Sequence, residues 1–215
     1  MKESSEKKRD RAEKIARILL KEYPSDQTAL VYGDPFQLLV AVILSAQCTD
    51  ARVNMVTPGL FARFSTPRDF ATADVRELES LIHSTGFYHN KAKNIIGCSQ
   101  ALLDRHSGIV PQTMEELFSL PGVGRKTANV VLGAAFGKIE GVVVDTHVIR
   151  LSNKLGLTKE QDAVKIEQDL MPLIKKKQWF HFSHSLILHG RKICSARKPL
   201  CTECSIRQYC PSSQV

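Results

Sequence analysis

TMEELFSLPGVGRKTANVVLGAAF, residues 113–136, contains two helix patterns joined by a glycine turn. Thr113 can cap a short first helix, and the second helix begins near Arg125 and continues through apolar residues. Gly122 and Gly124 permit positive φ and let the backbone approach another molecule closely. The amides that open the second helix favour an anion, typically a phosphate. The stretch therefore predicts a helix–hairpin–helix element that binds DNA; the alternative is an ordinary helical hairpin.

The rest of the chain is also predicted to be helical. Residues 10–22 show amphipathic spacing, residues 35–48 are apolar enough for a fully buried helix, and residues 89–106 form the longest regular segment between them and the hairpin. Residues 142–144, three valines, are the one strand-like stretch, and they are too short and isolated to build a sheet. We expect an all-α protein.

Lys126 lies in the first turn of the second hairpin helix. The helix dipole opposes a positive charge there and Arg125 adds repulsion, and both effects favour a neutral, nucleophilic amine. The alternative is a plain phosphate-binding lysine, which residue chemistry alone leaves as the stronger interpretation.

Asp145 follows the three valines and precedes a helical pattern. A carboxylate that emerges from an apolar stretch is costly unless it is bonded or used. The residues alone favour a role as the N-cap of the next helix, although an N-cap can also face a cleft.

The charge is concentrated at the two ends of the chain. The net charge is +8, of which residues 1–17 carry +3 and residues 175–207 carry +7, while residues 18–174 carry −2. Such a distribution suggests a polyanionic partner, with a solvated basic surface as the alternative. The longest apolar run, Leu38 to Leu44, is far shorter than the roughly 20 residues of a membrane span, and no signal-peptide core opens the chain. We expect a cytoplasmic protein without a membrane partner.

Four of the six cysteines lie within seventeen residues, with the spacing C-x6-C-x2-C-x5-C. In an intracellular chain this spacing is typical of a metal site, in which four thiolates hold one Zn²⁺ or one [4Fe–4S] cluster. Residue chemistry alone favours zinc. Cys48 and Cys98 stand apart in predicted helices and are expected to be small buried hydrophobes. The four clustered cysteines are Cys194, Cys201, Cys204 and Cys210.

Taken together, these segments resemble the endonuclease III family of DNA glycosylases, over nearly the whole chain and in the family's order. The carrying residues are LLVAVILSAQCTDARV (38–53), TGFYHNKAKNI (85–95), LPGVGRKTANVVL (120–132), VDTHVIR (144–150) and LILHGRKIC with the three later cysteines (186–210).

The resemblance implies two all-α domains with a cleft between them. Residues 28–139 would form a six-helix barrel domain that contains the hairpin. Residues 1–27 and 140–215 would form the cluster domain. The cysteine spacing matches the [4Fe–4S] loop of the family. The resemblance therefore implies a [4Fe–4S] cluster at this site and not zinc.

The resemblance also implies roles for single residues. Lys126 matches the catalytic nucleophile and Asp145 the catalytic carboxylate. Gln47 matches a residue that fills the gap left by a flipped base, and Phe87 stands at the position of an apolar wedge that is often leucine in relatives. The remaining expected DNA contacts are Gly122, Gly124, Arg125, Arg191, Lys192, Arg197 and Lys198.

By resemblance, the chain is a bifunctional DNA glycosylase and AP lyase of base excision repair. It would remove oxidised pyrimidines from double-stranded DNA and cleave 3′ to abasic sites by β-elimination, as a monomer associated with a prokaryotic-type nucleoid. One alternative is a mismatch-specific glycosylase of the same superfamily, but such relatives usually lack the lysine found at Lys126. The other alternative is a non-enzymatic helix–hairpin–helix protein, against which Lys126 and Asp145 together argue.

Overall fold

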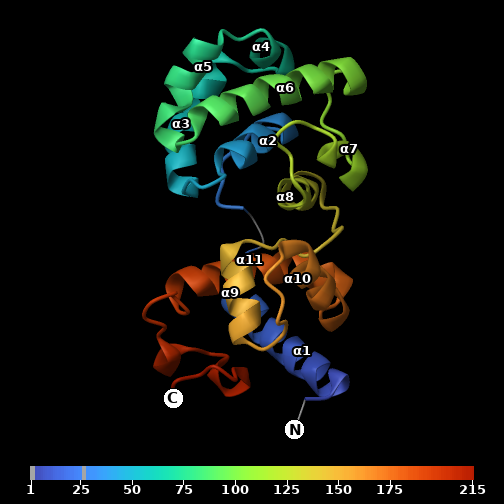
Figure 1. Cartoon of the computed structure of the whole chain (residues 1–215), viewed down its shortest axis with the longest axis vertical. Coiled ribbons are helices and arrows are strands. Elements are labelled where there is room, and N and C mark those ends of the chain that lie inside the picture. The colour runs from blue at the N-terminus through green and yellow to red at the C-terminus, as the bar shows by residue number, and fades with distance from the viewer. Residues whose placement is uncertain (1–2, 26–27) are drawn as a thin grey trace. The chain divides into compact units, whose positions relative to one another are not determined.

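The computed structural model describes residues 3–25 and 28–215, and every regular element in these ranges is helical (Figure 1). The all-α prediction is therefore confirmed. The chain divides into two compact units, Thr28–Lys138 and Met1–Gln27 with Ile139–Val215. The identity of these units as a six-helix barrel domain and a cluster domain, and the cleft between them, stay predictions.

The Thr28–Lys138 unit holds the hairpin and has a hydrophobic core of its own. Its longest helix, α6, packs against the short helices α4 and α5 and against the buried helix α2. The elements of this unit are α2 (Pro35–Leu44), α3 (Asp50–Arg63), α4 (Pro67–Ala71), α5 (Val75–Ile82), the 3-10 turn η1 (His83–Thr85), α6 (Tyr88–His106), α7 (Met114–Phe118) and α8 (Arg125–Phe136).

Helix α2 is buried on all sides, as its apolar sequence predicts, but it is shorter than expected. It ends at Leu44 and not at residue 48, because Ser45 caps it and its hydroxyl donates to the Val42 carbonyl. Cys48 consequently lies in the turn before α3 and is only partly buried, which corrects its assignment to a helix.

The other unit surrounds a second core, to which α1, α9, α10 and α11 contribute. Its elements are α1 (Ser5–Glu22), α9 (Thr146–Lys154), α10 (Ala163–Leu170), η2 (Met171–Leu173), η3 (Lys176–Gln178), α11 (Trp179–Lys192), η4 (Cys201–Glu203) and η5 (Arg207–Tyr209). Helix α1 packs along α11, so the two ends of the chain meet in this unit.

Two local predictions in this unit can be compared with the structure. Helix α1 starts at Ser5, five residues earlier than predicted, because Ser4 accepts a hydrogen bond from the Lys7 amide and caps it before the apolar pattern begins. The valines at residues 142–144 are buried but form no strand, and the Val143 amide donates to the hydroxyl of Ser183 at 2.9 Å. Among residues 3–25 and 28–215, no helix is long and apolar enough to cross a membrane.

Candidate active site and iron–sulfur loop

The glycine hairpin joins α7 to α8, as predicted. Thr113 caps α7 by accepting from the Glu116 amide, and the turn closes with a hydrogen bond from the Val123 amide to the Leu120 carbonyl at 3.1 Å. Leu120 and Val123 are buried and anchor the hairpin in the core of its unit. Gly124 is the N-cap of α8 and provides no side chain to bond the first amides of the helix.

The two hairpin glycines meet different constraints. Gly122 has a φ of +75°, and a Cβ added there would lie 2.7 Å from Cβ of Asn94 on α6. Gly124 has an ordinary φ of −88°, and a Cβ added there would meet nothing within 4 Å. The fold itself therefore requires glycine at Gly122. The space beside Gly124 is open, as a backbone that contacts a ligand would need.

Lys126 is exposed at the second position of α8, directly after the uncapped turn. Arg125 precedes it and is half-buried, and the first turn of α8 contains no acidic residue. The positive end of the helix dipole and two cationic side chains thus lie together, and they favour an anionic ligand.

Asp145 is the N-cap of α9, which confirms the structural interpretation of this residue. Its Oδ1 atom accepts from the amides of His147 and Val148 at 2.8 and 2.9 Å, and the side chain is half-buried. These bonds fix the carboxylate in one orientation through a single oxygen atom. His147 beside it is kept neutral, because burial, helped by Arg150 and Arg191, lowers its pKa against the opposing effect of Asp145.

Gln47 and Phe87 share an unusual backbone conformation. Both are exposed and both have left-handed φ values, 52° and 51°, which residues other than glycine rarely adopt. Phe87 is 61% exposed, an unfavourable state for a phenyl ring in water. Strained backbone at exposed side chains is typical of functional sites, and it marks these two turns.

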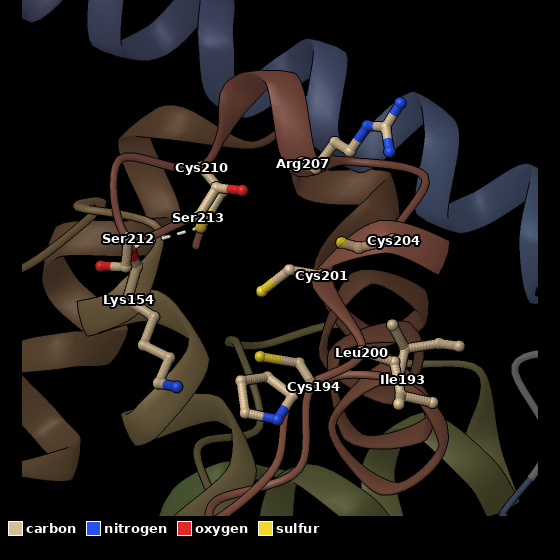
Figure 2. Close-up of a pocket in the computed structure, with 11 residues that line it drawn as sticks. Lys154, Ile193, Cys194, Leu200, Cys201, Cys204, Arg207, Cys210, Ser212 and Ser213 are labelled. Atoms are coloured by element: carbon tan, nitrogen blue, oxygen red, sulfur yellow. Dashed lines mark hydrogen bonds between the residues drawn. The ribbon is translucent and has the colours of Figure 1, made fainter. Parts of the chain in front are cut away.

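The four clustered cysteines line one pocket, and their sulfur atoms face a common space (Figure 2). All four are free and partly buried. The pocket has about 340 Å³ of space free of atoms, including the part open to solvent, and Lys154 and Arg207 contribute to its wall. In the ranges described, no group of three or more His, Cys, Asp or Glu side chains is placed to hold a single metal ion.

The four cysteines suit a [4Fe–4S] cluster better than a single metal ion. A single Zn²⁺ requires every thiolate at about 2.3 Å from one centre, whereas a [4Fe–4S] cluster spreads four thiolates around four irons. Burial raises the pKa of Cys204 and of Cys210. The other three thiols of the loop raise that of Cys204 further, and Cys194 and Cys201 raise that of Cys210 further. Four thiolates at this site therefore need a cationic centre between them.

Buried polar side chains surround the cysteine loop. Nε2 of the buried His189 lies 3.4 Å from Sγ of Cys204, and its Nδ1 lies 3.2 Å from the hydroxyl of Tyr23. Arg150 of α9 donates to the Cys194 carbonyl and to the Gly190 carbonyl.

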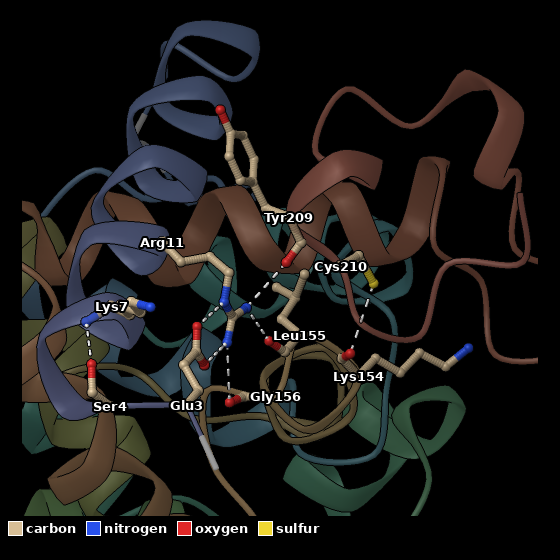
Figure 3. A network of polar contacts seen from close by, with 9 residues as sticks. All are labelled: Glu3, Ser4, Lys7, Arg11, Lys154, Leu155, Gly156, Tyr209 and Cys210. Carbon is tan, nitrogen blue, oxygen red and sulfur yellow. Dashed lines mark hydrogen bonds and ion pairs between the residues drawn. The ribbon is translucent and has the colours of Figure 1, made fainter. Parts of the chain in front are cut away.

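Arg11 of α1 makes a similar link at the other end of the loop (Figure 3). Its guanidinium donates to the carbonyls of Leu155 and Tyr209 at 2.5 and 3.1 Å and pairs with Glu3. Sequence reasoning missed Arg11, because a half-buried arginine on a lysine-rich helix has no distinguishing pattern in the sequence.

The basic residues that the sequence predicted to contact DNA are exposed and lie in or beside the cysteine loop. The Lys192 ammonium lies 5.6 Å from the centre of the Tyr23 ring. Ser195 shapes the turn before Lys198 by donating to its carbonyl and accepting from its amide. The exposed basic residues of this group are Arg191, Lys192, Arg197 and Lys198.

Comparison with known proteins agrees with this arrangement. Residues 40–176 match the model of the HhH-GPD superfamily base excision DNA repair proteins, and residues 194–210 match the iron–sulfur binding domain of endonuclease III. The endonuclease III of Synechocystis sp. is 57% identical over 208 residues, which cover 97% of this chain and 95% of that protein.

Two solved structures are similar over nearly the full chain. A non-covalent endonuclease III–DNA complex has a TM-score of 0.91 at 42% identity, with 95% of this chain and 96% of that chain covered. A trapped covalent endonuclease III–DNA intermediate has a TM-score of 0.88 at 43% identity, with 92% and 93% covered. The chain, with its glycine hairpin and four-cysteine [4Fe–4S] loop, belongs to the endonuclease III family of HhH-GPD superfamily base excision DNA repair proteins.

Proposed function

We propose that this chain is a bifunctional DNA glycosylase and AP lyase that excises oxidised pyrimidines from double-stranded DNA and cleaves 3′ to the resulting abasic site. The observation that carries the proposal is the exposed amine of Lys126 at the start of the uncapped helix α8, directly after the glycine hairpin. A hairpin that binds the phosphate backbone brings that amine to the DNA. Family membership and the similar DNA complexes support the same activity.

Lys126 is the nucleophile of the proposed reaction. Its neutral amine attacks C1′ of a nucleotide flipped out of the stack, the bond from C1′ to the base breaks, and the base leaves with the electron pair and takes up a proton. The bond from C1′ to the ring oxygen then breaks, the ring oxygen takes up the proton that the amine loses, and a Schiff base forms between the amine and C1′. The Schiff base makes the 2′ proton acidic, so its removal expels the 3′ phosphate. Water then hydrolyses the Schiff base and frees the amine.

Asp145 is the carboxylate of the proposed reaction. Its charge stabilises the positive charge that develops on the sugar and helps to activate the amine. The two cap hydrogen bonds from α9 hold its Oδ1 in place, so the orientation of the carboxylate is set before DNA arrives. The capping role and the catalytic role are therefore compatible in one residue.

DNA is held through backbone amides and basic side chains. The amides at Gly122 and Gly124 and the side chain of Arg125 bind phosphate near the lesion. The four basic residues around the cysteine loop bind phosphate farther along the duplex. Gln47 and Phe87 fill the space that the flipped base leaves, because both protrude from strained turns.

The cluster has a structural role in this proposal. Cys194, Cys201, Cys204 and Cys210 would hold it, and because all four ligands are protein thiolates no coordination position stays open for substrate. Bound iron supplies the positive charge that four adjacent thiolates require. We further propose that the protein acts as a monomer on DNA of the nucleoid.

The test is borohydride trapping on duplex DNA that contains either thymine glycol or an abasic site. The wild type should form a covalent adduct with both substrates, and Lys126→Gln should form none while it still binds DNA, because glutamine keeps the helix propensity but has no nucleophilic amine. Trapping by Lys126→Gln at the wild-type level would refute the assignment of the nucleophile. Base release by the wild type without any trapping would indicate a monofunctional glycosylase.

A further inference from the structure

Lys91 is a buried lysine that has no part in the proposed reaction. It lies in the first turn of α6 and is 4% exposed. A lysine ammonium is rarely buried to this extent without hydrogen-bond acceptors. Burial also lowers the pKa of Lys91, against an opposing effect of Cys48.

The acceptors of Lys91 lie at the ends of the two helical elements that lead into the strained turns. Its Nζ donates to the carbonyl of Leu44 at 2.8 Å and to the carbonyl of Thr85 at 2.8 Å. Leu44 is the last residue of α2, three residues before Gln47. Thr85 is the last residue of η1, two residues before Phe87.

The backbone of Lys91 adds a second bond to the turn that carries Phe87. Its amide donates to the carbonyl of Phe87 at 3.0 Å, so Thr85 and Phe87 are both bonded to this one lysine. Between them Gly86 also has positive φ, 71°, which glycine adopts without steric cost. The left-handed conformation of Phe87 costs free energy and persists only where the surrounding structure holds it.

We propose that Lys91 is a positioning residue that locks the two turns carrying Gln47 and Phe87 against each other, so that both side chains are presented together to the gap left by the flipped base. This inference rests on the proposed function for the roles of Gln47 and Phe87. The clamp itself rests on the two hydrogen bonds from Nζ.

The first arm of the test measures the clamp without DNA. Lys91→Met keeps an unbranched side chain that is one atom shorter but removes both hydrogen bonds from Nζ. Amide hydrogen exchange should become at least about 10-fold faster in the two turns, residues 45–48 and 85–88, because their strained conformation loses its restraint. The control is Leu102→Ala, which opens a cavity in the same helix far from these turns. Unchanged exchange in either turn of Lys91→Met, or equal acceleration in the control, overturns the clamp.

The second arm measures the function of the clamp. Duplexes carry thymine glycol or an abasic site, with 2-aminopurine as the opposite base, so that fluorescence reports whether side chains replace the lost stacking. Lys91→Met should release thymine glycol on the order of 10²-fold more slowly, as misplaced positioning groups do, and should change abasic-site cleavage by less than about 3-fold. The 2-aminopurine signal should also change in Lys91→Met and not in Leu102→Ala.

The outcomes separate this inference from the proposed function. Equal losses on both substrates, or an unaltered 2-aminopurine signal, refute the positioning role even where the wild type is fully active. A wild type that neither cleaves nor traps DNA refutes the proposed function. Hydrogen exchange still decides in that case whether Lys91 holds the two turns.

Discussion

Gly122→Ala tests whether the hairpin has the conformation described above. Alanine at a φ of +75° costs about 1 to 2 kcal/mol, because its Cβ approaches the following carbonyl oxygen. The added Cβ would also lie 2.7 Å from Cβ of Asn94, an atom that the backbone of α6 fixes and that no rotamer change can move. Overpacking of this kind costs about 1 to 3 kcal/mol more. The total loss should be about 2 to 5 kcal/mol.

Gly124→Ala is the matched control, two residues away in the same turn. Its φ of −88° suits alanine, and the new methyl group meets no atom within 4 Å. The loss of stability should stay under about 1 kcal/mol, the usual difference between glycine and alanine at an N-cap. If this backbone contacts phosphate, the methyl group disturbs a charge-assisted hydrogen bond worth about 1.5 to 3 kcal/mol, and DNA affinity falls about 10- to 100-fold.

Thermal denaturation and fluorescence anisotropy on abasic-analogue DNA at one fixed salt concentration measure the two effects. Gly122→Ala should lower Tm by roughly 5 to 20 °C. Gly124→Ala should lose affinity with little change in Tm. A Gly122→Ala protein as stable as the wild type would show that the left-handed turn is wrong. Undiminished binding by Gly124→Ala would show that its backbone does not approach a phosphate.

Three further predictions concern the carboxylate, the basic loop and the cluster. Asp145→Asn keeps most of the cap of α9 and loses the charge, so single-turnover base release should slow by roughly 10²- to 10³-fold with little change in Tm; a rate near that of the wild type leaves Asp145 as a cap alone. Lys198→Ala should weaken binding to all DNA sequences alike and flatten the slope of log affinity against log salt by roughly one unit; an unchanged slope removes Lys198 from the phosphate contacts. The purified protein should be yellow-brown with about four irons per chain, and Cys201→Ser should lower the iron content and the visible absorbance together; a colourless protein with one zinc contradicts the cluster.

The sequence predicted the hairpin and the buried helix well, because both depend on local patterns. Glycine spacing and a capping threonine determine the turn between α7 and α8, and a continuous apolar run can only be buried. The helix ends were predicted less well. Helix α1 begins earlier because Ser4 caps it, and α2 stops at Leu44 because the chain turns toward Gln47.

The role of Lys91 was missed although the sequence contained a signal for it. Lys91 falls on the buried stripe of α6, in helical register with Ile95, Cys98 and Leu102. A lysine at a stripe position is unusual and calls for acceptors in the interior. Those acceptors are the backbone carbonyls of Leu44 and Thr85 at the ends of two helical elements, and no pattern in the sequence shows that both face Lys91.

The sequence predicted which residues form the cysteine loop but not the contacts that hold the loop in place. In residues 194–210, all of which the structure describes, Ile206 is the one buried apolar side chain. Two short 3-10 turns are the regular structure of the loop. So small a buried surface cannot hold seventeen residues against the conformational entropy that ordering them costs, about 1 to 2 kcal/mol for each backbone unit. The loop therefore needs bonds other than hydrophobic contacts.

Those bonds come from the thiolates and from two arginines. In the proposed function the four cysteines attach the loop to a common centre. Arg11 bonds the carbonyl of Tyr209 near the end of the loop, and Arg150 bonds the carbonyl of Cys194 at its start. Arg150 belongs to α9, the helix that Asp145 caps. Any loosening of the loop thus reaches the helix that holds the proposed catalytic carboxylate, through one side chain. A cluster without an open coordination position can in this way support the reaction without contacting the substrate, because it keeps the N-terminus of α9 and its carboxylate in place.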